Sequence, residues 1–267
     1  MEILQYTFFQ NALIGSLLAS IVCGFIGTYI VTRRLVFISG GITHASFGGI
    51  GLGVYLGINP ILSAMAFAVM CAFGVQWISR KTNVREDSAI ALFWTLGMSI
   101  GIIFSFLTPG FMTDLSSFLF GNILIIETAD LYLLGLLTVV VVLVFALFFR
   151  LIISVAFDRT FALSQQLPVK TTEYVMMALI AITIVSTLRM IGIVLAISLL
   201  TIPQMTANLL TFNYKKMIGW SILIGWIDCL LGLMISYTLN VPSGASIIFV
   251  GILIYTLTRI IKLFYRN

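Results

Sequence analysis

Residues 131–149 read LYLLGLLTVVVVLVFALFF and contain no charged side chain. A helix needs about 20 apolar residues to cross the hydrocarbon core of a bilayer, and this run with its flanks reaches that length. The same character extends along the chain, which is 61% hydrophobic and 9% charged, whereas a typical soluble domain has about 25% charged residues. A soluble fold of 267 residues could not bury so much apolar surface. The sequence therefore predicts a protein that lies in a lipid bilayer.

Working outward from this run, we expect an all-α, polytopic transmembrane helical bundle that forms a single domain over residues 1–267. Two candidate spans are unusual, because residues 174–188 are few and residues 39–57 contain seven glycines and a histidine. A bundle of eight spans with one re-entrant or broken segment is therefore the alternative to nine spans. The candidate spans are residues 11–32, 39–57, 60–79, 88–107, 129–153, 174–188, 192–211, 217–239 and 243–257.

The basic residues predict the orientation, because cytoplasmic loops carry an excess of Lys and Arg. If the N-terminus is outside and the C-terminus cytoplasmic, all of the 14 basic residues except Arg189 fall on the cytoplasmic side. The net charge of +5 then reflects topology and gives no indication of nucleic-acid binding. The outer connections contain Glu2, Asp114, Glu127 and Asp130, which either attract cations or are simply solvated.

Two ionisable side chains fall inside candidate spans, where they are costly and indicate function. His44 is the only histidine and lies in the glycine-rich segment beside Thr43. Imidazole is a good zinc ligand and also binds manganese or iron. Asp228 lies in the middle of residues 217–239, so its carboxyl must be protonated, paired or hydrated. It either pairs with Arg189 or faces a pathway and helps His44 to hold a cation, with Thr43 lining that pathway.

Pro203 interrupts another apolar run, and the polar residues Gln204 and Asn208 follow it. A proline inside a helix removes a backbone hydrogen bond and bends the helix. Broken helices with freed carbonyls line the pathways of many transporters. We therefore expect Pro203, Gln204 and Asn208 to lie along a pathway, with a simple packing kink as the alternative.

Residues 156–170 are the least membrane-like segment. Residues 158–167 are compatible with a short amphipathic helix that Asp158 caps and Pro168 stops. Its apolar side would either dock a cytoplasmic partner or lie flat on the lipid surface. The apolar residues expected on that side are Phe157, Phe161, Ala162 and Leu167.

Motifs for ATP binding and hydrolysis are missing. The sequence contains no GxxxxGK[ST] phosphate-binding loop and no HExxH motif. One GxSxG match, residues 97–101, falls inside a candidate span, and we interpret it as close helix packing rather than as a nucleophile elbow. If this chain serves transport driven by ATP, we therefore expect it to be a transport subunit and not an enzyme, with the ATPase a separate chain.

Several short segments, in order and at the right spacing, resemble one family: the membrane permeases of bacterial ABC importers for zinc, manganese and iron, also called metal-chelate ABC permeases. Individually these segments are weak, and together they are specific from about residue 10 to residue 257. The segments are residues 32–50 (TRRLVFISGGITHASFGGI), 85–90 with 118–124, 157–168, 199–207 and 242–245 (PSGA).

Three positions depart from the family pattern. The aspartate four residues before the histidine is Gly40 here, and we hypothesise that Asp228 replaces it. The glycine of the loop's G-L-P is Gln166, and the aspartate before the P-S-G-A segment is Asn240.

The resemblance implies a multi-pass subunit of the bacterial cytoplasmic (inner) membrane that forms the pathway as a homodimer. It implies a cytoplasmic ABC ATPase, which uses the ATP and docks on the 157–168 loop, and an extracytoplasmic metal-binding protein. The transported ion would be zinc by preference, with manganese or iron as alternatives, and no cofactor would be permanently bound. A proton- or sodium-coupled carrier using His44 and Asp228, or a permease for a metal chelate, are the competing interpretations.

Overall fold

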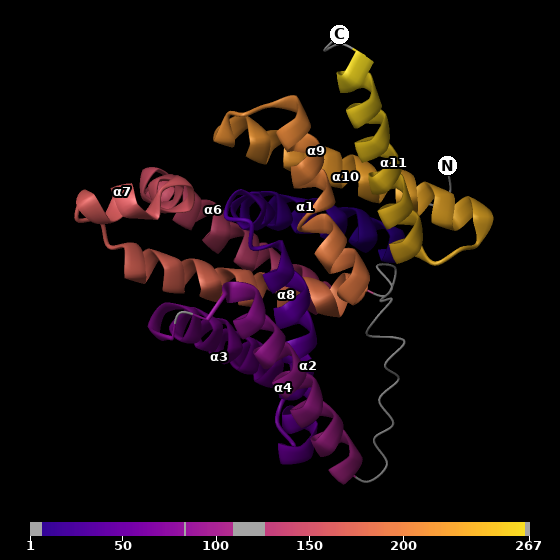
Figure 1. The fold of residues 1–267 in the computed structure, drawn as a ribbon. Coiled ribbons are helices and arrows are strands. Elements are labelled where there is room, and N and C mark those ends of the chain that lie inside the picture. The colour runs from indigo at the N-terminus through magenta and orange to yellow at the C-terminus, as the bar shows by residue number, and fades with distance from the viewer. Residues whose placement is uncertain (1–6, 83, 109–125, 265–267) are drawn as a thin grey trace. The chain divides into compact units, whose positions relative to one another are not determined.

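A computed structural model describes residues 7–82, 84–108 and 126–264, with only the backbone described at residues 189 and 190. Within those ranges every regular element is an α-helix (Figure 1). The predicted all-α polytopic bundle is therefore confirmed. Eight helical segments of the described residues are long and apolar enough to cross a membrane. They are Thr7–Thr32, Pro60–Lys81, Glu86–Leu107, Thr128–Phe157, Val169–Leu188, Ile191–Leu210, Tyr214–Leu239 and Ser243–Phe264.

The chain divides into two compact units. The first unit comprises Met1–Arg34, Ser116–Leu147 and Thr187–Asn267, and the second comprises Leu35–Leu115 and Phe148–Ser186. Two of the passages of the chain from one unit to the other lie within long helices, α6 (Thr128–Phe157) and α8 (Val169–Leu199). Both helices are broken close to these passages, at Phe148 (φ −111°, ψ 21°) and at Gly192 (φ 78°, ψ 169°). The single permease domain expected over the whole chain stays a prediction.

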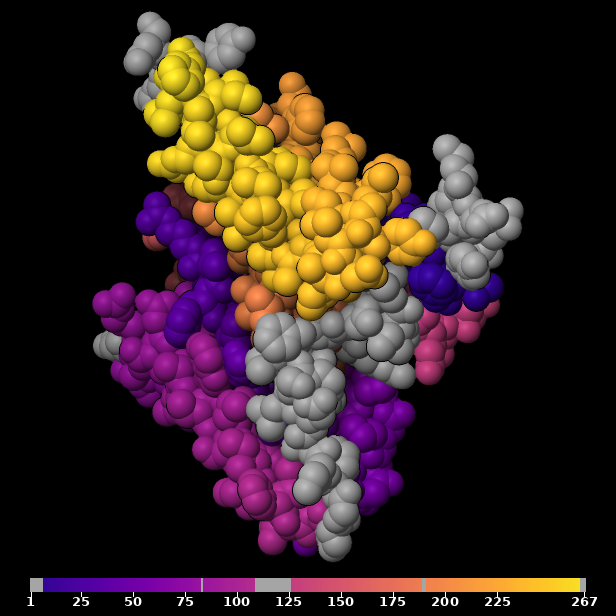
Figure 2. Space-filling model, turned by 90° about the vertical axis from the view of Figure 1, so that its right-hand side faces the viewer, coloured from indigo at the N-terminus to yellow at the C-terminus, as the bar shows by residue number. Residues whose placement is uncertain are grey.

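The first unit contains α1 (Thr7–Thr32), the first part of α6, the end of α8, α9 (Ile202–Leu210), α10 (Tyr214–Leu239) and α11 (Ser243–Phe264). Asn213 caps α10 by accepting a hydrogen bond from the backbone N–H of Lys215 at 3.0 Å. Small residues let these helices approach closely, because Gly24 of α1 faces Ile222 and Gly232 of α10 faces Ile247, with no room for a methyl group at either glycine. Figure 2 shows α11, in yellow, along the surface of this unit.

The second unit contains α2 (Val36–Leu56), α3 (Pro60–Lys81), α4 (Glu86–Leu107), the end of α6, α7 (Arg159–Ser164) and the first part of α8. The helix α3 begins where the sequence predicts, because Pro60 fits the first turn and Asn59 accepts a hydrogen bond from Ile61 N at 2.9 Å. The glycine-rich α2 is one continuous, largely buried helix rather than a broken segment.

Glycines set the distance between α2 and α4, which lie side by side (Figure 1). A Cβ atom added at Gly48 would come within 2.7 Å of the Gly97 carbonyl oxygen, and one at Gly51 within 2.5 Å of the Gly101 carbonyl oxygen. Real Cβ atoms do not approach so closely, so larger residues would push the helices apart. The interpretation of the GxSxG match as helix packing is confirmed, because Gly97 and Gly101 belong to this contact.

Candidate metal pathway and coupling helix

His44 lies on α2 and is partly buried within the second unit. Its imidazole ring stacks flat on the indole of Trp94 from α4, with ring centroids 4.6 Å apart and planes 2° from parallel. Phe37 packs against the same indole at 5.9 Å. Stacking occupies a face of the imidazole, whereas its two nitrogens bind protons or metals in the ring plane. The contact therefore fixes the ring and leaves its ligating edge available.

Thr43, the neighbour of His44, makes a hydrogen bond within its own helix. It is buried, and its hydroxyl donates to the Ser39 carbonyl one turn earlier at 2.5 Å. The structure therefore gives this side chain an intrahelical hydrogen bond, and its predicted place along a pathway stays a prediction. Gly40 lies four residues before His44, on the same helical face, where the family pattern has its aspartate.

Asp228 lies on α10 in the first unit and is only 2% exposed. Its Oδ1 has no hydrogen-bond partner among the described residues. Gly251 of α11 makes room for the carboxylate, because a Cβ there would lie 3.1 Å from Oδ2. A buried carboxylate without a partner is expensive and in a membrane segment indicates a functional group.

The joint action of His44 and Asp228 on one ion stays a prediction, because the two residues belong to different units. The alternative partner Arg189 has its side chain outside the described residues, so that pairing also stays a prediction. Among the described residues no group of three or more His, Cys, Asp or Glu side chains could hold a metal ion. His44 and Asp228 are thus single candidate ligands rather than parts of a formed cage.

The break near Pro203 has a different position from the one that the sequence predicts. The interruption falls at residues 200–201, and Pro203 lies in the first turn of α9, where its missing N–H is not needed. Gln204 is fully buried, and its Nε2 donates to the Leu199 carbonyl at 3.0 Å and to the Cys23 carbonyl of α1 at 2.7 Å. The side chain therefore ties the end of α8 to α1.

Asn208, in contrast to Gln204, is exposed on α9. The two polar residues thus have different environments, and a pathway role for Pro203, Gln204 and Asn208 stays a prediction. The sequence identifies both polar residues, but it does not distinguish an amide that is hydrogen-bonded in the interior from one that is exposed.

The loop of residues 157–168 contains the short helix α7, as expected, although this helix covers only six residues. Asp158 caps it by accepting a hydrogen bond from Phe161 N at 2.9 Å. The helix ends at Ser164, well before Pro168, because Gln166 adopts a left-handed conformation with φ 56°. The N–H of Leu167 then bonds to the Ala162 carbonyl at 3.1 Å, which closes the helix end.

The role predicted for Pro168 as a stop is therefore wrong. Its carbonyl instead accepts the hydrogen bond of Thr172 N at 3.1 Å and starts α8. The family pattern has glycine at the position of Gln166, which fits the left-handed conformation observed there.

The four apolar residues expected on one side of the loop differ in their exposure: two are largely exposed and two pack against the bundle. Phe157 and Phe161 are 63% and 54% exposed. Ala162 is fully buried, and Leu167 packs with it against Val155 and Val169. Ala162 therefore does not lie on an exposed face, whereas a partner contact of the partly buried Leu167 stays a prediction. Both side chains anchor the loop to its own bundle.

Sequence reasoning missed Glu173 on α8, which is 2% exposed and forms ion pairs with Arg80 of α3 and Arg159 of α7. In the sequence analysis, Arg80 and Arg159 served only to predict the orientation of the chain in the membrane. The one available signal was an acidic residue among segments that are otherwise rich in basic residues.

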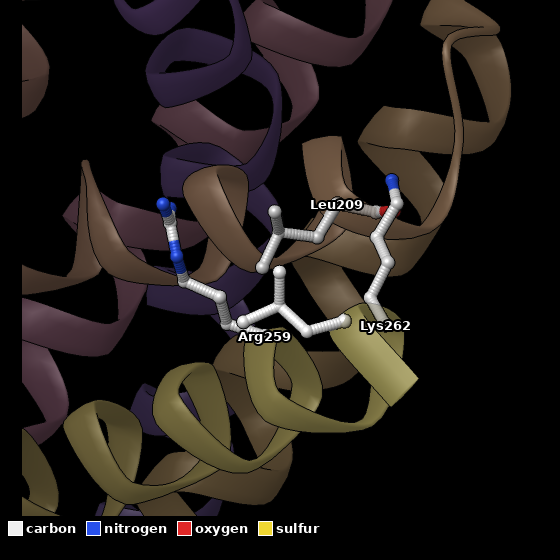
Figure 3. A pocket seen from close by; sticks show the side chains of 4 residues that line it. Leu209, Arg259 and Lys262 are labelled. Carbon is white, nitrogen blue, oxygen red and sulfur yellow. The ribbon is translucent and has the colours of Figure 1, made fainter. Parts of the chain in front are cut away.

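A pocket in the first unit is lined by Leu209, Arg259, Lys262 and Leu263 and has a volume of about 180 Å³ (Figure 3). The Lys262 ammonium group donates to the Leu209 carbonyl. Two cationic side chains beside the pocket repel a metal ion, so it does not suit a metal pathway. The family segment 118–124 and the acidic residue Asp114 lie outside the described residues.

The model of the family described as "ABC 3 transport family" matches residues 5–262. An uncharacterized membrane protein of Synechocystis, slr2045, is 38% identical over 257 residues, which cover 96% of this chain and 92% of the relative. The manganese transport system membrane protein MntC of Listeria monocytogenes is 33% identical, covering 95% of this chain and 90% of its own length.

A solved structure, PsaBC from Streptococcus pneumoniae in complex with Fab, contains a chain of similar fold. It has a TM-score of 0.85 and 28% sequence identity, and the match covers 96% of this chain and 92% of that chain. The similarity thus extends over both units and is not confined to one motif.

Proposed function

Because this chain belongs to the ABC 3 transport family, we propose that it is the membrane-spanning permease subunit of an ATP-driven importer for a divalent transition metal. The observation that carries the proposal is similarity over almost the whole chain to proteins named for metal transport. The subunit moves the ion and makes or breaks no covalent bonds, while a separate cytoplasmic ATPase hydrolyses ATP. An extracytoplasmic binding protein delivers the ion.

Manganese is the first candidate for the ion. The relatives named for manganese include MntC of Listeria monocytogenes and the import permease ScaB of Streptococcus gordonii, at 33% and 30% identity. A ligand set that includes a carboxylate together with an imidazole suits manganese better than a purely nitrogen or sulfur site does. Zinc, which the lone histidine favours, and iron are the competing ions in the test below.

His44 and Asp228 are proposed to bind the ion in passage. The Asp228 oxygen without a hydrogen-bond partner among the described residues, and the stacking that leaves the edge of the His44 imidazole uncovered by the indole, support this role. A transit site with few ligands releases its ion more readily than a full cage. Two copies of the chain enclose the pathway in this proposal, with Thr43, Pro203, Gln204 and Asn208 along it.

The loop of residues 157–168 is proposed to face the cytoplasm, with the N-terminus of the chain outside, as the distribution of basic residues favours. Phe157 and Phe161 are the side chains that touch the ATPase, since both are largely exposed. Asp158 holds the helix that carries Phe161. Ala162 and Leu167 fix the helix to the permease beneath.

Reconstitution tests this function. The permease, its ATPase and its binding protein in proteoliposomes should accumulate manganese against a gradient when ATP is present. The permease alone should not, and competition with zinc and iron ranks the ions. Uphill uptake by the permease alone under a proton or sodium gradient would instead establish a secondary carrier.

The docking role of the loop has its own test. Phe161→Asp places a charge on the exposed apolar face and should release the ATPase during co-purification. Leu163→Asp, at a neighbouring exposed position of α7, serves as the matched control for an added charge. An intact complex with the Phe161 variant contradicts the docking role.

A further inference from the structure

Three helices of the second unit meet at one buried carboxylate. Glu173, near the start of α8, is 2% exposed. It forms an ion pair with Arg80 at the end of α3, and its Oε1 lies 3.3 Å from Arg159 Nε at the start of α7. The carboxylate thus joins the coupling helix to two long helices of the bundle.

The arginine on α3 is itself held in place. In the orientation that avoids setting two donors against each other, the Gln76 amide oxygen accepts from Arg80 Nη2 at 2.8 Å. The Arg80 side chain is 20% exposed, so it remains tied to the buried end of the network. Arg159, at 41% exposed, is the outer arm and the one on the helix that faces the ATPase in the proposed function.

From α3 the contacts continue to the helix that carries His44. A Cβ atom added at Gly49 of α2 would come within 2.6 Å of Ala64 Cα on α3, so these backbones touch. Gly53 makes a second close approach, with Pro60 Cα 2.9 Å from its added Cβ. Because the two backbones are in direct contact and no free space separates them, a displacement of α3 also displaces α2.

We propose that Glu173 is a positioning residue that carries displacement of α7 to α3 and, through α3, to the His44 region of α2. The inference rests on the proposed function, because it names the linkage by which a docked ATPase would act on the pathway. Charge-assisted pairs suit this task, since their geometry is directional and one carboxylate can hold two guanidinium groups on different helices. The linkage is a contiguous set of contacts inside one unit, which is the physical requirement for transmitting a change.

Arg159→Gln is the principal test, because this half-exposed arm can be removed while the Glu173–Arg80 pair stays in the interior. Asp87→Asn is the matched control, since it removes an exposed ion pair with Arg85 in the same unit. The measurements are co-purification of the ATPase, ATP hydrolysis by the full complex, and manganese uptake in proteoliposomes. Glu173→Gln and the double variant Arg159→Gln/Glu173→Gln complete the set.

The expected result is uncoupling. The Arg159 variant keeps its ATPase and hydrolyses ATP at a rate close to that of the unmodified complex, while manganese moved per ATP falls about tenfold, within the usual range for coupling between sites. The double variant transports no less than Glu173→Gln alone, because both changes cut the same linkage. Asp87→Asn leaves the ratio unchanged.

The inference is overturned if Arg159→Gln, assembled with its ATPase, keeps the unmodified ratio of manganese to ATP. It is also overturned if the losses of the two single variants simply add in the double variant. Failure of the unmodified complex to take up manganese, zinc or iron with ATP is a different outcome, because it removes the proposed function itself.

Discussion

Two acidic side chains, one in each unit, are equally buried and differ in everything around them. Asp228 in the first unit has an oxygen with no partner among the described residues, beside a glycine that makes room for it. Glu173 in the second unit holds arginines from two other helices. An unpaired buried acid costs stability and is kept for what it binds, whereas a paired one organises the fold around it. Burial alone therefore does not identify a transport ligand.

The largest expected effect is on manganese uptake, and it distinguishes residues that bind the ion from residues that only stabilise the fold. His44→Ala and Asp228→Asn should each lower manganese uptake by about tenfold or more, comparable to the loss from disturbing a metal site. Assembly with the ATPase should persist, because neither residue touches the coupling helix in the proposed arrangement. Initial uptake rates at several manganese concentrations measure this, and an unchanged rate for either variant removes that residue from the pathway.

For the free energy of unfolding, we expect the opposite order of the two acidic residues, with the larger loss at Glu173. Glu173→Gln should lower the free energy of unfolding by about 2 kcal/mol, less than for a fully buried pair because both arginines keep some contact with solvent. Asp228→Asn should leave stability unchanged or raise it slightly, since an unpaired carboxyl becomes a neutral amide. Thermal unfolding in detergent compares the two, and equal losses would show that the acids do not differ in the way described.

A smaller effect tests the space beside Asp228. Gly251→Ala adds a methyl group 3.1 Å from Oδ2, and the crowding should cost about 1 kcal/mol of stability. Gly219→Ala on α10 is the control, because nothing lies within 4 Å of the added atom. If both alanine variants unfold alike, the space beside Asp228 is not restricted.

The smallest effect concerns the turn that follows α7. Gln166→Gly should stabilise the protein by about 0.5 kcal/mol, because glycine adopts φ 56° without the strain of a side chain, less its own entropy cost. Asn240→Gly, at φ 52°, should gain only a few tenths, since asparagine tolerates this conformation. A loss of stability in the Gln166 variant would mean that its side chain makes a contact that outweighs the strain.

Much of the fold follows from local signals. The predicted ends at residues 60, 107, 239 and 243 agree with the helices observed, because hydropathy, Asn59 with Pro60, and the segment after Asn240 mark them. The cap at Asp158 was predictable for the same reason. Each of these signals acts over a few residues of chain.

The remaining features depend on contacts between distant segments. Glu173 lies more than 90 residues from Arg80, so no local pattern indicates their pairing. The hydrogen bond from Gln204 to the Cys23 carbonyl could not be predicted either, because Cys23 lies on the first helix, 181 residues away. The left-handed Gln166 was hidden because glutamine rarely adopts that conformation, although the family glycine at this position was a hint.

The flat contact between His44 and Trp94 has a practical consequence. An indole this close to an imidazole changes its emission when the imidazole gains a proton or a metal ion. The chain has four tryptophans, and replacing Trp77, Trp220 and Trp226 with phenylalanine would leave Trp94 as a single fluorophore. If an ion binds His44 as proposed, the emission of Trp94, whose ring centroid lies 4.6 Å from that of the imidazole, should report its binding.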